Sequence, residues 1–158
     1  MNQSQPRSKF IRPLLWIGGI LGGLMLVFAI VMGVMMARMG DVPSDLDTST
    51  TRPSDNGLFT VSYTASTEPI PINQIHQWTL HVESAEGQPV EDATITVDGD
   101  MPQHGHGLPT RPQMTKNLGN GDFLVEGMKF QMGGWWLIDF TITANDQTDV
   151  VHFNMMLK

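Results

Sequence analysis

The chain has 158 residues, no cysteine and a net charge of −7 at neutral pH. The lack of cysteine excludes disulfides, Cys-based zinc sites and thiol nucleophiles. All 16 acidic residues but only five of the nine basic ones follow residue 40, which leaves the segment from Asp41 with a net charge of −11. An acidic segment without a basic patch argues against a nucleic-acid partner.

The first predicted element is a membrane anchor at residues 14–37, a run of 24 residues without a charge. A helix needs about 20 apolar residues to cross a bilayer, so this run is long enough. Its end, Met35-Met36-Ala37, fits a signal-peptidase site poorly, which favours an uncleaved anchor. The basic residues of the tail at residues 1–13 predict a cytoplasmic N-terminus and a periplasmic or extracellular C-terminal domain.

One face of this predicted helix carries Gly18, Gly22 and Met25, continued by Ala29, Met32 and Met36. Small residues four apart let two transmembrane helices approach closely. This face therefore favours packing against a helix of a membrane partner. The alternative is that glycine and methionine are simply common in such helices.

After a flexible linker at residues 38–57, residues 58–158 show short runs of alternating apolar and polar residues. This alternation is typical of half-buried strands, and no stretch has a helical period. About 100 residues with six or seven strands predict an all-β, immunoglobulin-like β-sandwich after the helix. The predicted strands lie near residues 59–65, 78–82, 93–97, 123–130, 136–142 and 151–157.

Residues 100–114, DMPQHGHGLPTRPQM, follow the third predicted strand and read as a long loop. His104 and His106 are two residues apart, so an extended backbone points both imidazoles the same way. Gly105 lets the backbone bend them toward one point. Imidazole and thioether ligands suit copper, Cu(I) above all, and the methionines that could add thioethers are Met101, Met114, Met128 and Met132. The alternative is an exposed strand connection, with the methionines as core residues.

The stretch GDMPQHGHG at residues 99–107, followed by Pro109, resembles the YtkA-like family of exported domains. The later stretch GDFLVEGMKFQMGGWWLI, at residues 121–138, is also similar to that family. A single span before such a domain resembles FixH-like proteins. The resemblance implies an immunoglobulin-like sandwich, candidate ligands at His104, His106 and Met101 with Met128 and Met132 behind them, and a role in copper handling or respiratory oxidase assembly.

Motifs of the common enzyme classes, such as GxSxG, HExxH or a glycine-rich phosphate loop, do not occur in the chain. The sequence therefore predicts a non-enzymatic, membrane-anchored copper-binding accessory protein. Such a protein would act as a metallochaperone or assembly factor for a respiratory oxidase, contacted through the Gly18–Gly22–Met25 face. The alternative is a metal-free structural or assembly subunit of a membrane complex.

Overall fold

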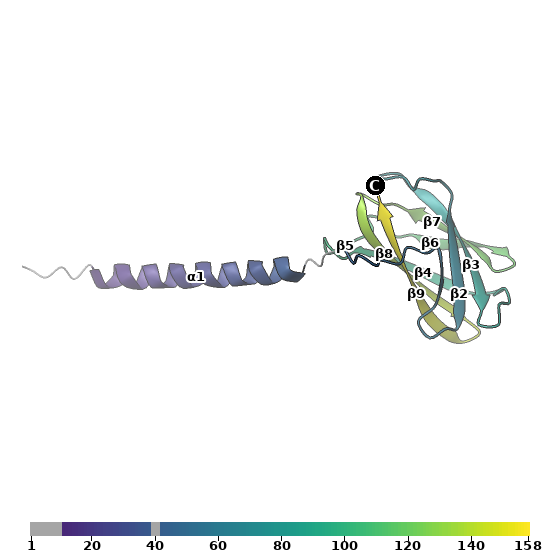
Figure 1. Ribbon diagram of the computed structural model, residues 1–158, viewed down its shortest axis with the longest axis horizontal. Helices are drawn as coiled ribbons and strands as arrows, with labels where there is room; N and C mark the ends of the chain where they lie inside the picture. The colour runs from purple at the N-terminus through teal and green to yellow at the C-terminus, as the bar shows by residue number, and fades with distance from the viewer. Residues whose placement is uncertain (1–10, 39–41) are drawn as a thin grey trace, which may run out of the picture. The chain divides into compact units, whose positions relative to one another are not determined.

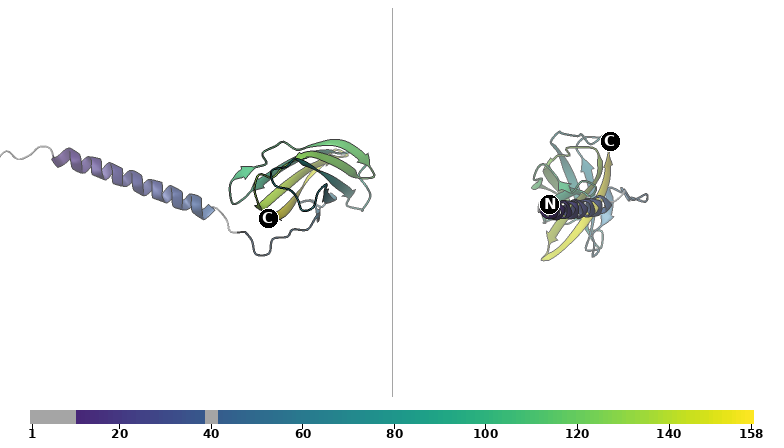
Figure 2. Two further views of the ribbon diagram at one scale, coloured as in Figure 1. Left: turned by 90° about the horizontal axis from the view of Figure 1, so that it is seen from above. Right: turned by 90° about the vertical axis from the view of Figure 1, so that its left-hand side faces the viewer.

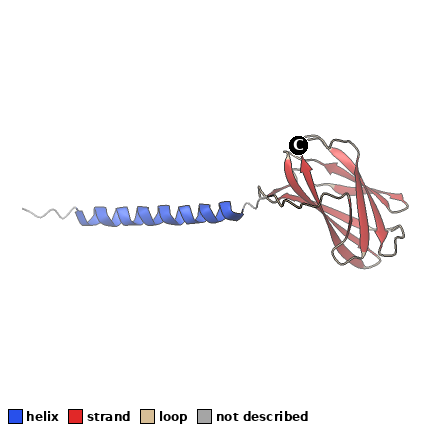
Figure 3. Cartoon of the chain, viewed as in Figure 1, coloured by secondary structure: helices blue, strands red, loops and turns tan. Residues whose placement is uncertain are grey.

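The computed structural model describes residues 11–38 and 42–158, with side chains described for 21–34 and 42–158. The chain divides into two compact units, Met1–Gly40 and Asp41–Lys158. The first contains the helix and the second contains all the strands (Figures 1 and 3).

Helix α1 covers Ile11–Arg38, 28 residues, and so contains the whole predicted anchor at residues 14–37. Its side chains from 21 to 34 are all exposed. Within the described part of the chain, no helical stretch meets the length and hydropathy that a membrane crossing needs. The side chains of residues 14–20 and 35–37, which include Gly18 of the predicted packing face, lie outside the described residues, as does the tail at residues 1–10.

The second unit is built from strands that pair antiparallel in a single series, so the all-β prediction is confirmed. The order across the sheet is β1-β2-β3-β7-β6-β4-β8-β9, with β5 added to β4. The strands are β1 (Thr51–Pro53), β2 (Phe59–Ala65), β3 (His76–Ser84), β4 (Thr94–Met101), β5 (His106–Gly107), β6 (Gln113–Gly119), β7 (Asp122–Met128), β8 (Gly134–Ala144) and β9 (Gln147–Leu157).

The series curves round a common interior (Figure 2), and its two halves are joined at one narrow point. Only the pair Thr96–Gln113 links β4 to β6. At the other side the two ends of the series, β1 and β9, approach each other. The backbone amide of Asp55, just after β1, donates a hydrogen bond to the carbonyl of Val150 on β9 at 2.8 Å. The domain is therefore one large, nearly closed antiparallel sheet.

Three strands differ from the sequence prediction. Strand β1 lies inside the predicted linker. This segment forms a strand because its backbone pairs with β2. Strand β6 carries a mostly exposed, polar sequence, QMTKNLG, so it lacks the alternation by which a strand is recognised. Strand β5 lies inside the predicted long loop, which is in fact a short hairpin on β4.

The core is aromatic and lies wholly within this unit. Trp78 and Trp136 are both fully buried. Tyr63 stacks on Trp78 with ring centroids 4.4 Å apart, and Phe130 meets Trp136 edge to face at 5.1 Å. Every core residue among the described side chains belongs to the unit Asp41–Lys158, so this unit has a hydrophobic core of its own.

A buried carboxylate ties the segment before β2 to β9. Asp149 is 3% exposed and accepts hydrogen bonds from the backbone amides of Asn56 and Leu58 and from the Asn56 side chain. Burial alone would raise its pKa, but hydrogen bonds from Ser54, the Val150 amide and Asn56 lower the pKa to about 2. The carboxylate therefore stays ionised and satisfies donors that would otherwise be unpaired.

Candidate metal site

The two loop histidines lie at the tip of the hairpin formed by β4 and β5. The turn between the strands is closed by the amides of His104 and Gly105, which both donate to the Met101 carbonyl, at 2.9 and 2.8 Å. Gly105 has φ of 65°, the left-handed region that glycine adopts most easily. Register then places His106 directly opposite Met101.

This geometry brings the two imidazoles together. The rings of His104 and His106 are stacked, with centroids 5.8 Å apart and planes 23° from parallel. His104 is exposed and His106 is half-buried. One imidazole can therefore be reached freely, and the other is held by the protein.

His106 is held by two neighbours, Gln131 in the segment before β8 and Trp136 on β8. The fully buried ring of Trp136 meets His106 edge to face, with centroids 6.2 Å apart. The Gln131 amide nitrogen donates to Nδ1 of His106 at 2.9 Å. The side-chain oxygen of Gln131 is buried and has no hydrogen-bond partner among the described residues. With Nδ1 engaged in this way, Nε2 is the nitrogen of His106 that remains for a ligand.

Two of the four candidate methionines belong to the chain segments that form this site. Met101 is fully buried and is paired directly opposite His106, so the two residues are neighbours across the hairpin. Met132 is 39% exposed and directly follows Gln131. Its backbone carbonyl accepts a hydrogen bond from the Trp136 indole at 3.1 Å. Met132 therefore supplies an accessible sulfur in the segment that holds His106.

The other two methionines lie elsewhere. Met114 follows Gln113, which pairs with Thr96, five residues before Met101 on β4. At roughly 3.4 Å per residue, Met114 is about 17 Å from the hairpin. Met128 is fully buried opposite His76. His76 contacts Phe130, Phe130 contacts Trp136, and Trp136 contacts His106, so two aromatic rings lie between His76 and the hairpin. Met128 is a core residue, and Met114 is partly buried and packs against the core.

The remaining histidines also lie outside the hairpin. His81 contacts Asp122 at 2.7 Å, and that hydrogen bond raises the pKa of the imidazole. His152 lies between Asp139 and Asp55, at 2.6 and 3.1 Å, and the hydrogen bond with Asp139 is the largest cause of its raised pKa. His76 is 8% exposed and packs on Phe130.

The hairpin offers two imidazoles, and Met132 in the segment before β8 offers an accessible thioether. Such a donor set suits Cu(I) better than Zn²⁺. In the part of the chain that the structure describes, no three His, Asp or Glu side chains come together as a metal site. The sequence reasoning missed Gln131, which has no recognisable motif. It identified Trp136 only as a core residue of β8.

Comparison with known proteins identifies the domain. A family model described as YtkA-like matches residues 55–141, more than half of the chain. No curated protein and no solved structure matches the sequence. The matched range contains the β4–β5 hairpin together with Gln131, Met132 and Trp136. The chain therefore belongs to the YtkA-like family.

Proposed function

We propose that the chain is a membrane-anchored, extracytoplasmic copper-binding accessory protein that passes Cu(I) to a respiratory oxidase or helps to assemble it. The observation that carries this proposal is the stacked pair His104–His106 beside Gln131. Two imidazole nitrogens and one thioether form a soft site of low coordination number, which suits Cu(I) and its transfer to a partner.

His106 and His104 have different roles in this site. His106 would bind through Nε2, with Gln131 as the outer partner that orients the ring. Binding through Nε2 places the imidazole proton on Nδ1. A rotation of the Gln131 side-chain amide by about 180° would then turn its unpaired oxygen toward Nδ1, and this oxygen would accept a hydrogen bond from the Nδ1–H group. The exposed His104 would then be the ligand through which copper enters or leaves.

The membrane anchor is part of the proposal. Residues 14–37 carry no charge, and basic residues precede them, which favours a cytoplasmic N-terminus and a periplasmic or extracellular domain. One span before a YtkA-like domain supports a FixH-like organisation. The single link between the two halves of the sheet supports an immunoglobulin-like sandwich.

The test is a titration of the domain, residues 41–158, with Cu(I) against a competing chelator. We expect one tightly bound ion for the wild type and loss of that binding in His104→Ala/His106→Ala. The matched control, His81→Ala/His152→Ala, removes the same number of imidazoles outside the hairpin and should retain the ion. Absence of binding by the wild type, or equal loss in both variants, would refute the copper site.

A second candidate is a metal-free assembly subunit that binds a membrane complex through α1. It is favoured by the exposure of the apolar side chains of this helix, among them Met25 at 77% and Phe28 at 67%. Gly22 has open space around it, so Gly22→Ile changes only the surface offered to a partner. Crosslinking in membranes should then show loss of a partner in Gly22→Ile but not in His104→Ala/His106→Ala. The copper hypothesis expects the histidine variant to be the one that fails in oxidase assembly.

A further inference from the structure

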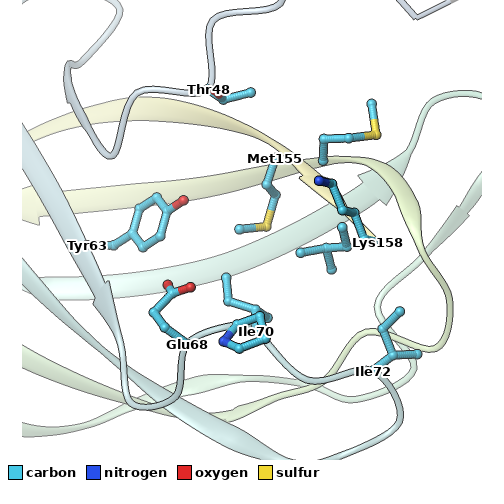
Figure 4. A pocket seen from close by; sticks show the side chains of 10 residues that line it. Thr48, Tyr63, Glu68, Ile70, Ile72, Met155 and Lys158 are labelled. Atoms are coloured by element: carbon cyan, nitrogen blue, oxygen red, sulfur yellow. The ribbon is translucent and has the colours of Figure 1, made fainter.

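A cavity of about 600 Å³ lies between β2, the loop at residues 68–72 and the end of β9 (Figure 4). Its volume is within the range of small-molecule sites, about 300–1,000 Å³. Its walls are mainly aliphatic, with Ile70, Ile72 and Leu157 joined by the thioether of Met155. Such walls suit a flexible hydrocarbon chain better than a flat ring.

A tyrosine hydroxyl points into this cavity. Tyr63 is 9% exposed, and its ring is fixed by stacking on Trp78 and by an edge contact with Phe153. Its phenol oxygen points into the space between the lining side chains (Figure 4). This oxygen faces the cavity, where it is available to a bound ligand.

The polar groups at the cavity define the head group that would fit. Burial, with a smaller effect of Glu68, raises the pKa of Tyr63, so the phenol stays protonated and can donate. The Glu68 carboxylate beside it can accept. The Lys158 side chain also lines the cavity and supplies a second donor. A head group that offers both an acceptor and a hydroxyl donor matches this arrangement.

We propose that this cavity binds a neutral single-chain amphiphile of the monoacylglycerol type. Its chain would lie against Ile70, Ile72 and Leu157, its ester carbonyl would accept from Tyr63, and a glycerol hydroxyl would donate to Glu68. The positive charge of Lys158 would attract an anionic head group, but the Glu68 carboxylate and the net charge of −11 carried by residues 41–158 oppose it. The proposal is independent of copper, since no candidate ligand of the hairpin lines the cavity.

The test uses the domain, residues 41–158, with ¹³C-labelled methionine methyl groups, a chelator to remove metals and monolaurin below its micelle concentration. We expect saturable shifts of the Met155 and Met156 methyl signals, since both residues line the cavity. Met114 lies outside it and serves as an internal control. Shifts that are absent, do not saturate or affect Met114 equally would overturn the proposal.

Variants then test the binding mode. Ile72→Trp fills the cavity and should abolish binding, whereas Ile75→Trp changes an exposed isoleucine outside the cavity and should not. Tyr63→Phe keeps the ring contacts and removes one hydrogen bond, so affinity should fall about 2- to 10-fold. Unchanged binding in Ile72→Trp would overturn the site, and equal or tighter binding of laurate would overturn the neutral head group. Near-ultraviolet circular dichroism checks that each variant is folded.

Discussion

The Asp149 carboxylate offers the sharpest test of the fold, because one buried charge holds the segment before β2 against β9. Asp149→Asn keeps the shape of the side chain and removes the charge that Asn56, Leu58 and Ser54 surround. The fall in pKa from 3.8 to about 2 corresponds to a stabilisation of about 2.5 kcal/mol at pH 7. This value is an upper bound, because solvent and the neighbouring dipoles screen part of the charge. We therefore expect the variant to lose about 1–2 kcal/mol of unfolding free energy.

The pH dependence follows from the direction of the shift. The folded state holds the carboxyl proton less tightly than the unfolded chain, so this stabilisation is complete above about pH 5 and is lost as the pH falls toward 2. Urea unfolding of residues 41–158, monitored by tryptophan fluorescence from pH 7 to pH 2.5, gives the unfolding free energy of the wild type and of Asp149→Asn. The exposed Asp92→Asn serves as the matched control and should change little. A difference between wild type and Asp149→Asn that stays constant down to pH 2.5, or is absent at pH 7, would refute the reasoning.

Three further predictions concern the site, a titration and a turn. Gln131→Leu removes the hydrogen bond that orients His106, so Cu(I) affinity should fall about 10-fold in the chelator competition, and unchanged affinity would exclude this role. The pKa of the His152 imidazole should lie above its ordinary value of 6.5 in an NMR titration. Its contribution to stability is therefore full below pH 6.5 and is lost as the pH rises through the raised pKa. Asp139→Asn should return the pKa toward 6.5. Gly121→Ala should destabilise the domain by about 2 kcal/mol in urea, because φ is 78° and the new Cβ would lie 2.7 Å from a backbone carbonyl oxygen; a loss below 0.5 kcal/mol would contradict this.

The amino-acid sequence by itself determined the fold class and most of the strands. Strands β2, β3 and β8 alternate buried and exposed residues along their length, and this period is written directly in the order of apolar and polar residues. The pairing of His104 with His106 was also local, because two residues around one glycine can meet without help from the rest of the chain. The resemblance to the YtkA-like family rested on the same local stretches.

The tertiary structure alone decided which residues share the candidate site. Gln131, before β8, and Trp136, on β8, reach His106 only because this part of the chain lies against the β4–β5 hairpin, and no local pattern encodes that contact. Strand pairing likewise placed Met114 on β6, away from the hairpin, and left Met132 as the accessible thioether. A pairing between distant strands depends on the packing of the whole core, whereas strand period and turn chemistry depend on neighbours in the chain. For that reason the sequence predicted the pair of histidines, whereas only the tertiary structure shows that Gln131 and Trp136 contact His106.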